Sequence, residues 1–179
     1  GNLGCMQLGR IEFDRRGGSV FADFIDNSGG VHASDREVNL KILMGIAETE
    51  GKVGRVERDE IIESVADDVV GSILYDNFLQ AQIISQETLS SPRGIEAYMD
   101  LMDRRGREGI LDRELEFLPS SEEMAQRSRE GKPMASPEIA VLLAYAKRSL
   151  TDHILASTLP VDPHFATDLL EYFPPAIAE

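Results

Sequence analysis

Signals that start helices recur along this sequence from residue 34 onward, and apolar residues at helical spacing follow them. The clearest signal is Ser136-Pro137-Glu138, where a capping serine precedes a proline whose missing N–H is harmless in the first turn. The residues behind it form an apolar stripe, namely Ile139, Leu142, Leu143, Ala146 and Leu150. This pattern favours helices packed on helices, and we expect this helix to be central.

Similar signals divide the rest of this region into helices. Ser34-Asp35-Arg36-Glu37 and Ser120-Ser121-Glu122-Glu123 have the form of capping boxes, and Ser91-Pro92 repeats the proline signal. Glycine and proline residues end the periodic runs. We therefore expect helices at about residues 34–48, 56–66, 68–89, 92–106, 121–131, 137–157 and 163–172.

Residues 1–33 have a different sequence pattern, because glycines interrupt the segment and helical periodicity is missing. Two short apolar runs, residues 6–13 and 19–24, are typical of strands. The sequence Asp14-Arg15-Arg16-Gly17-Gly18 between them has turn chemistry. The predicted fold is therefore mainly α: a multi-helix bundle with a short N-terminal β-hairpin or strand remnant.

The net charge of the chain argues against two classes of binding partner. The chain has 18 Lys and Arg against 32 Asp and Glu, a formal net charge of -14. This balance argues against binding to nucleic acid or to an anionic membrane surface, which both attract clustered basic residues. No apolar run approaches the ~20 residues of a membrane helix. The single cysteine, Cys5, excludes an internal disulfide and is typical of a cytoplasmic protein.

Motifs that would indicate a particular chemistry are missing from the sequence. It contains neither G-x-G-x-x-G nor the P-loop pattern of nucleotide-binding proteins. The three histidines, His32, His153 and His164, are far apart and lack the spacing of metal ligands. We therefore expect no metal site.

The segment from Asp26 to Ser34 is the best candidate for a binding site. It leads from the end of a predicted strand through Gly29 and Gly30 to the capped start of a helix. Glycines allow close approach of the backbone to a ligand, a helix start favours an anion, and Asn27 adds an amide. The segment could hold a carboxylate or a nicotinamide carboxamide. The alternative is a plain strand-to-helix turn, which the local pattern alone favours.

The same segment resembles glutamate dehydrogenases. Asn27-Ser28-Gly29-Gly30-Val31, followed by Ser34 and Glu37, is similar to their stretch Asn-Ala-Gly-Gly-Val-x-x-Ser-x-x-Glu. The likeness is closest to the large-type NAD-specific enzymes of bacteria and covers nearly the whole chain. The motifs that support it are Asn2-Leu3-Gly4, Gln7, Gly9-Arg10-Ile11-Glu12, Asp26-Asn27-Ser28, Ser34-Asp35-Arg36-Glu37-Val38-Asn39, Asp76-Asn77, Leu111-Asp112-Arg113, Leu118-Pro119, residues 137–147 and Tyr172-Phe173-Pro174.

The resemblance implies oxidative deamination of L-glutamate to 2-oxoglutarate and ammonia, with NAD as the hydride acceptor. Ser34 aligns with the serine that binds the side-chain carboxylate of glutamate. Asn27, Gly29 and Gly30 align with the loop beside the nicotinamide, and Asn2 aligns with an asparagine near the nicotinamide ribose. Asp35 and Arg36 depart from the smaller glutamate dehydrogenases, which have aromatic residues there.

The resemblance also implies that the active enzyme is longer than this chain. The catalytic Lys and Asp of the family, and its Gly-rich dinucleotide loop, lie earlier in what we call the parent enzyme. We therefore expect no catalytic residue in this chain and no activity from it alone. Residues 1–50 would be the tail of the dinucleotide-binding catalytic domain, and residues 51–179 an all-helical C-terminal domain that serves packing, regulation or contact within a homo-oligomer.

An alternative interpretation is an acidic helical interaction or oligomerisation module without catalysis. Ser34 separates the two interpretations. In an enzyme, Ser34→Ala should raise the KM for glutamate, whereas in a module it should cost only ~1 kcal/mol of helix capping. A third possible function is that of an acidic protein that mimics nucleic acid, and only the net charge supports it.

Overall fold

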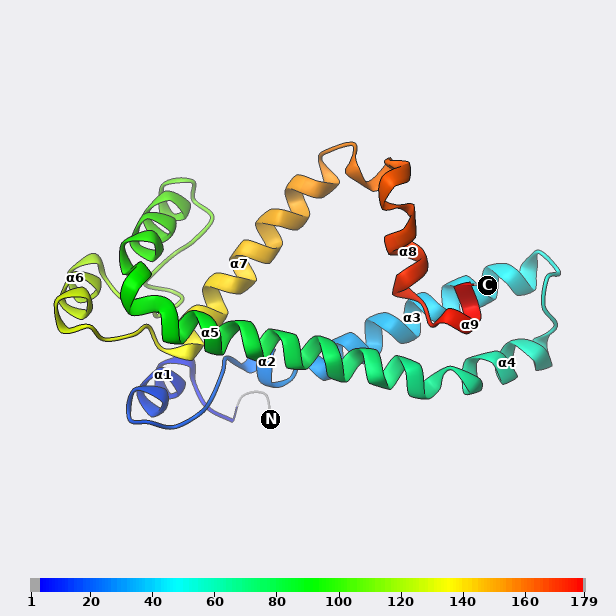
Figure 1. Cartoon of the computed structure of the whole chain (residues 1–179), viewed down its shortest axis with the longest axis horizontal. Helices are drawn as coiled ribbons and strands as arrows, with labels where there is room; N and C mark the ends of the chain where they lie inside the picture. Colours follow the sequence, from blue (N-terminus) through cyan, green and yellow to red (C-terminus); the bar gives the residue numbers. More distant parts are fainter. Residues whose placement is uncertain (1–3, 179) are drawn as a thin grey trace. The chain divides into compact units, whose positions relative to one another are not determined.

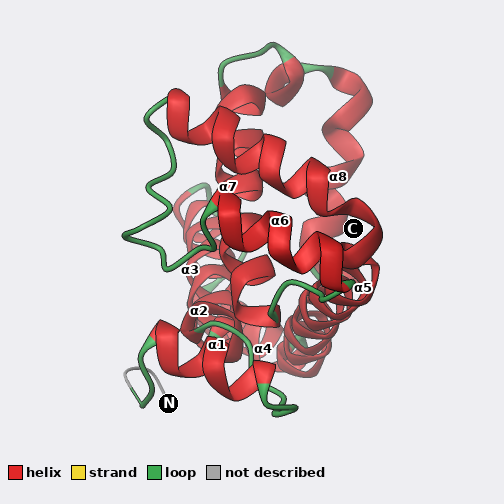
Figure 2. Ribbon diagram, turned by 90° about the vertical axis from the view of Figure 1, so that its left-hand side faces the viewer, coloured by secondary structure: helices red, strands yellow, loops and turns green. Residues whose placement is uncertain are grey.

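In the computed structural model, residues 4–178 are described, and every regular element among them is a helix (Figures 1 and 2). The prediction of a mainly α fold is confirmed. The α-helices are α1 (Gln7–Arg15), α2 (Asp23–Asp26), α3 (Ser28–Thr49), α4 (Arg55–Ser64), α5 (Ala66–Arg107), α6 (Ser121–Glu130), α7 (Ser136–Leu155), α8 (Ala166–Tyr172) and α9 (Pro175–Ala178), and two short 3-10 helices are η1 (Leu159–Val161) and η2 (Pro163–Phe165).

The chain forms two compact units. Unit 1 comprises the residues up to 27 together with 79–150, and unit 2 comprises residues 28–78 together with those from 151 onward. The long helices α5 and α7 contribute residues to both units. The functional division expected at residue 50 stays a prediction.

The predicted N-terminal β-hairpin is wrong. The first predicted strand lies mostly in α1, and the second is an irregular stretch that leads into α2. The apolar residues that suggested a strand do not share a buried face, because Ile11 is buried while Leu8 and Phe13 are about half exposed. Arg10 fixes the segment instead, since its buried guanidinium forms ion pairs with Asp23 and Asp26.

The core of unit 1 surrounds the first half of α7. Residues 137–142 of that helix are all buried, among them Ile139 and Leu142 of the predicted apolar stripe. Leu143 of the stripe is partly buried, whereas Ala146 and Leu150 are exposed, so the stripe prediction is correct only for the first half of the helix. The predicted capping box of α6 is also confirmed: the Glu123 N–H donates to Ser120 Oγ (3.2 Å), and the Ser120 N–H donates to Glu123 Oε2 (2.8 Å). The buried residues that complete this core are Ala22, Ile25, Ile84, Ile95, Met102, Leu111, Leu118, Met124 and Met134.

Helix α5 runs through the position where the sequence predicted a helix boundary. Pro92 lies inside it, and Gly94 has non-helical angles (φ -113°, ψ 15°), so the two predicted helices are joined across a kink. Ser91 is buried and is not a helix cap. Its Oγ donates to the Thr88 carbonyl (2.8 Å) and accepts from the Met134 N–H (2.9 Å), which ties the kink to the loop before α7.

Unit 2 has a smaller core. Leu40 and Met44 of α3 pack with Val65, the residue between α4 and α5. Partly buried side chains from the loop before α4, from α4, from the start of α5 and from the C-terminal segment surround them: Val53, Ile61, Ile62, Val69, Phe173 and Ile177. This core holds α3, the helix that contains most of the predicted site residues.

Candidate functional site

The structure places the predicted site residues on and just before α3. Asn2 lies outside the described residues. Asn27 links α2 to α3, while Gly29, Gly30 and Ser34 lie within α3 itself. The predicted glycine loop and the predicted cap at Ser34 are therefore wrong, because the helix begins six residues earlier, at Ser28.

A tertiary contact explains the early start of α3. Ser28 is buried, and its hydroxyl donates to Asn77 Oδ1 on α5, whose own Nδ2 donates to the Ile73 carbonyl (2.7 Å). Gly29 faces the same amide, because a Cβ placed there would lie 3.6 Å from Asn77 Nδ2. The contact between α3 and Asn77 joins residues far apart in sequence, so local capping rules cannot reveal it.

Arg36 makes the second set of contacts that hold α3. Its Nη2 donates to Asp76 Oδ2 of α5 (3.0 Å), and its Nη1 donates to the Tyr172 carbonyl at the end of α8 (2.8 Å). The guanidinium also lies 4.9 Å from the centre of the Tyr172 ring, a cation–π geometry. Asn39 adds a hydrogen bond to the Tyr172 hydroxyl (2.9 Å). All four residues, Arg36, Asn39, Asp76 and Tyr172, lie within motifs shared with glutamate dehydrogenases, but no local pattern indicates that they contact one another.

The two faces of α3 have different surroundings. Its inner face includes Leu40 and Met44, which are buried in the core of unit 2. What we call the outer face of α3 consists of four apolar side chains that are half exposed: Val31 (58%), Val38 (50%), Ile42 (55%) and Ile46 (51%). Ser34 is exposed and, at 3.6 residues per turn, falls on this outer face between Val31 and Val38. The predicted carboxylate-binding hydroxyl is thus accessible to a ligand.

The start of α3 has the features expected of a nicotinamide-binding segment. The first N–H groups of a helix have no partner within that helix, and they attract a carboxamide or carboxylate oxygen. Gly30 is exposed in this first turn, and Asn27 directly before it is exposed as well. Asn27, Gly30 and Ser34 are thus exposed, and Gly29 packs beside Asn77; their predicted roles toward nicotinamide and substrate stay predictions.

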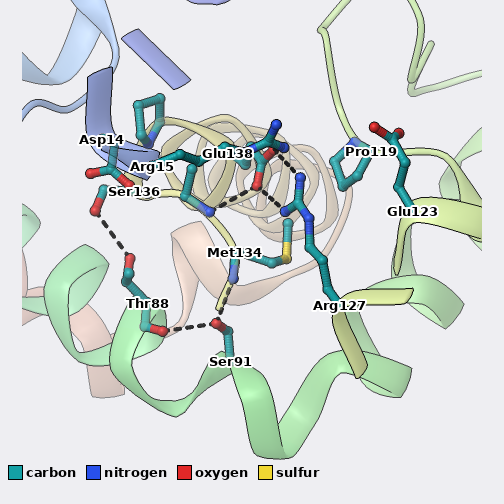
Figure 3. Close-up of polar contacts among 12 residues, drawn as sticks. Asp14, Arg15, Thr88, Ser91, Pro119, Glu123, Arg127, Met134, Ser136 and Glu138 are labelled. Atoms are coloured by element: carbon teal, nitrogen blue, oxygen red, sulfur yellow. Dashed lines mark hydrogen bonds and ion pairs between the residues drawn. The ribbon is translucent and has the colours of Figure 1, made fainter. Parts of the chain in front are cut away.

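A second polar cluster lies inside unit 1, around the buried side chain of Glu138 (Figure 3). Arg127 of α6 donates to both carboxylate oxygens, from Nη1 to Oε2 (2.6 Å) and from Nη2 to Oε1 (2.9 Å). Arg15 of α1 donates to Oε1 (2.8 Å), and the Ala135 N–H donates to Oε2 (2.8 Å). Burial raises the pKa of Glu138 to about 7, although the Ala135 N–H and Arg15 act in the opposite direction.

The Glu138 cluster joins helices and does not present a reactive group. Four donors occupy its two oxygens, and the side chain has no exposed surface, so a substrate cannot reach it. The hydrogen bond between the Ala135 N–H and Glu138 is one of the two bonds of a capping box. In that bond the side chain of a Glu in the first turn accepts from the N–H three residues earlier. Glu138 thereby connects α1 and α6 to the start of α7.

Within residues 4–178, no group of three His, Cys, Asp or Glu side chains has an arrangement that could hold a metal ion. Within the same range, no helix combines the length and the apolarity that spanning a membrane requires.

Comparison with known proteins gives matches along the chain. Residues 1–87 match the family model described as bacterial NAD-glutamate dehydrogenase, catalytic domain, and residues 131–179 match glutamate dehydrogenase, C-terminal. All 179 residues align with NAD-specific glutamate dehydrogenases from Halomonas elongata (40% identity), Pseudomonas aeruginosa (39%) and Mycobacterium tuberculosis (40%). No solved structure matches the chain.

The two matched models, which together cover most of the chain, place it among the glutamate dehydrogenases. More specifically, the chain belongs to the bacterial NAD-specific glutamate dehydrogenase family. It spans 11% of the length of these three relatives. The resemblance inferred from the sequence motifs is confirmed.

Proposed function

We propose that this chain is a segment of an NAD-dependent glutamate dehydrogenase, the parent enzyme, that oxidatively deaminates L-glutamate to 2-oxoglutarate and ammonia. The observation that supports this most directly is the match of residues 1–87 to the family's catalytic domain. In that segment Ser34 is exposed, and the resemblance aligns it with the family's substrate-binding serine.

Ser34 binds the side-chain carboxylate of glutamate, because an exposed hydroxyl can donate a hydrogen bond to an anion. Asn27, Gly29 and Gly30 bind and orient the nicotinamide of NAD at the first turn of α3. The resemblance assigns the contact with its ribose to Asn2, which is outside the described residues. Gly29 belongs to the same proposed nicotinamide segment and packs beside Asn77, where a Cβ would lie at an ordinary contact distance of 3.6 Å from Nδ2. Bound NAD supplies the hydride acceptor.

The chain by itself does not catalyse the reaction. Deprotonation of the amine needs a group of suitable pKa beside the substrate, and the resemblance puts the family's catalytic Lys and Asp elsewhere in the parent enzyme. Residues 51–179 serve packing and subunit contact in a homo-oligomer. A cytoplasmic location fits the single cysteine, Cys5.

Formation of NADH by the purified parent enzyme tests the proposed function. We expect turnover with L-glutamate, little or none with other amino acids, and none from the 179-residue chain alone. The matched control is the parent enzyme with Ser90→Ala, an exposed position outside the proposed site, which should behave as wild type. A parent enzyme that is inert with glutamate would contradict the proposal.

The second candidate function is an acidic interaction module. Its support is the net charge of -14 combined with half-exposed apolar residues on α3. This function would be preferred if the parent enzyme were inert with glutamate and with every other amino acid tested.

A further inference from the structure

The outer face of α3, consisting of Val31, Val38, Ile42 and Ile46, is left half exposed by the residues that the structure describes. Apolar residues on two opposite sides of a helix are typical of a helix that is buried on both sides. A contiguous apolar patch of a few hundred Å2 on a surface commonly marks an interaction site. The residues of α3 therefore indicate a missing neighbour.

We propose that the outer face of α3 is the docking surface for the remainder of the catalytic domain, the part of the parent enzyme outside these 179 residues. The proposal rests on the proposed function. Two observations identify this occupant. Helix α3 lies within the segment that matches the catalytic-domain model, and the chain spans only 11% of the length of its relatives.

A second copy of this chain is a weaker explanation. A stable interface between separate molecules buries about 800 Å2 on each partner, and four half-exposed aliphatic side chains on one helix do not provide that area. A domain within the same polypeptide does not need so large a surface, because covalent linkage supplies a high effective concentration. The size of the patch therefore favours an intramolecular contact.

The position of Ser34 on this face links docking to substrate binding. Ser34 falls between Val31 and Val38, so a domain that covers these side chains would also exclude water around the Ser34 hydroxyl. Loss of water lowers the local dielectric constant and strengthens a hydrogen bond from Ser34 to a carboxylate. Docking on the outer face would thus close the substrate site.

Thiol labelling of Ile42→Cys tests the proposal without relying on turnover. The variant is made with Cys5→Ser, both in the 179-residue chain and in the parent enzyme, and labelling by a maleimide is followed on the proteolytic peptide by mass spectrometry. The matched control is Ser64→Cys, a nearly isosteric change at an exposed position of α4 in the same unit. Circular dichroism checks that each variant is folded.

We expect Ile42→Cys to react at least about tenfold more slowly in the parent enzyme than in the isolated chain. Ser64→Cys should react alike in both. Equal reactivity of Ile42→Cys in the two proteins would overturn the proposal. So would protection in the isolated chain together with a dimer in sedimentation equilibrium, because a second copy would then cover the face.

Two additions keep the test decisive. Val38→Cys, on the same face, replaces Ile42→Cys if that variant misfolds and should give the same protection. Glutamate turnover is measured on the same parent enzyme before labelling. Turnover without protection contradicts docking and leaves the proposed function intact, whereas protection without turnover supports docking and contradicts the proposed function.

Discussion

The buried Glu138 cluster and helix α3 show two different outcomes of the same kind of sequence pattern. Glu138 lies at the start of α7, and both α7 and α3 start where a segment with serine or glycine meets apolar residues at helical spacing. Around Glu138, each polar group has a partner and the flanking residues of α7 are buried. On α3, the inner face is buried and the outer face is exposed. A helical pattern therefore predicts the helix but does not say whether the chain itself covers both faces.

Glu138→Ala is expected to lower the free energy of unfolding more than the other variants proposed for this comparison. The change leaves Arg127 and Arg15 without their shared carboxylate, and removal of one partner of a buried ion pair costs ~3–5 kcal/mol. Urea denaturation followed by circular dichroism measures the loss. Glu12→Ala is the control, because its ion pair with Arg16 is exposed and should contribute little. Equal losses for the two variants would show that the cluster does not stabilise unit 1.

Ser91→Ala is expected to have the next largest effect. It removes the acceptor of the buried Met134 N–H, and an unsatisfied buried donor costs ~1–3 kcal/mol. The neighbouring Ser90→Ala, at an exposed position, should change the free energy of unfolding by less than half as much. If the two variants were equally stable, the bond between the α5 kink and the loop before α7 would not matter for folding.

Ser120→Ala should destabilise unit 1 by a smaller amount. The variant deletes the oxygen that accepts from the Glu123 N–H at the start of α6, and loss of such a cap costs ~1 kcal/mol. Ser128→Ala, at an exposed position within the same helix, serves as the control and should leave stability unchanged or slightly higher. A midpoint of thermal unfolding that is the same for both variants would contradict the assigned cap.

A substitution on the outer face of α3 is expected to change the free energy of unfolding least. Val38→Lys should alter the free energy of unfolding of the isolated chain by less than ~0.5 kcal/mol, as exposed substitutions commonly do. Leu40→Lys, two residues away on the inner face, should unfold unit 2 because it buries a charge in the core. A large loss for Val38→Lys would mean that this chain already covers the outer face.

Local patterns predicted the features that depend on neighbours in sequence. The cap at Ser120 and the mainly α class follow from short-range hydrogen bonding and apolar spacing. The start of α7 was predicted to within one residue, because the helix includes Ser136 instead of beginning after it. The resemblance to glutamate dehydrogenases was also visible, because its motifs are continuous stretches of residues.

Features that depend on distant residues could not be predicted in this way. The β-hairpin was wrong because ion pairs from Arg10 and the packing of Ile11 favour a helix in a glycine-interrupted segment. The cap at Ser34 was wrong because the contact between Ser28 and Asn77 starts α3 earlier. The ion pairs of Glu138 with Arg15 and Arg127 likewise join separate helices, so no local motif indicated them.

The most direct test of the central claim, that α3 presents the substrate-binding serine on its outer face, is the KM for L-glutamate of the parent enzyme with Ser34→Ala. Loss of a hydrogen bond to a charged group is worth ~1.5–3 kcal/mol, so we expect KM to rise about ten- to a hundredfold. The thermal midpoint should stay near that of wild type, because Ser34 is exposed and is not a helix cap. An unchanged KM in a folded, active variant would contradict the claim.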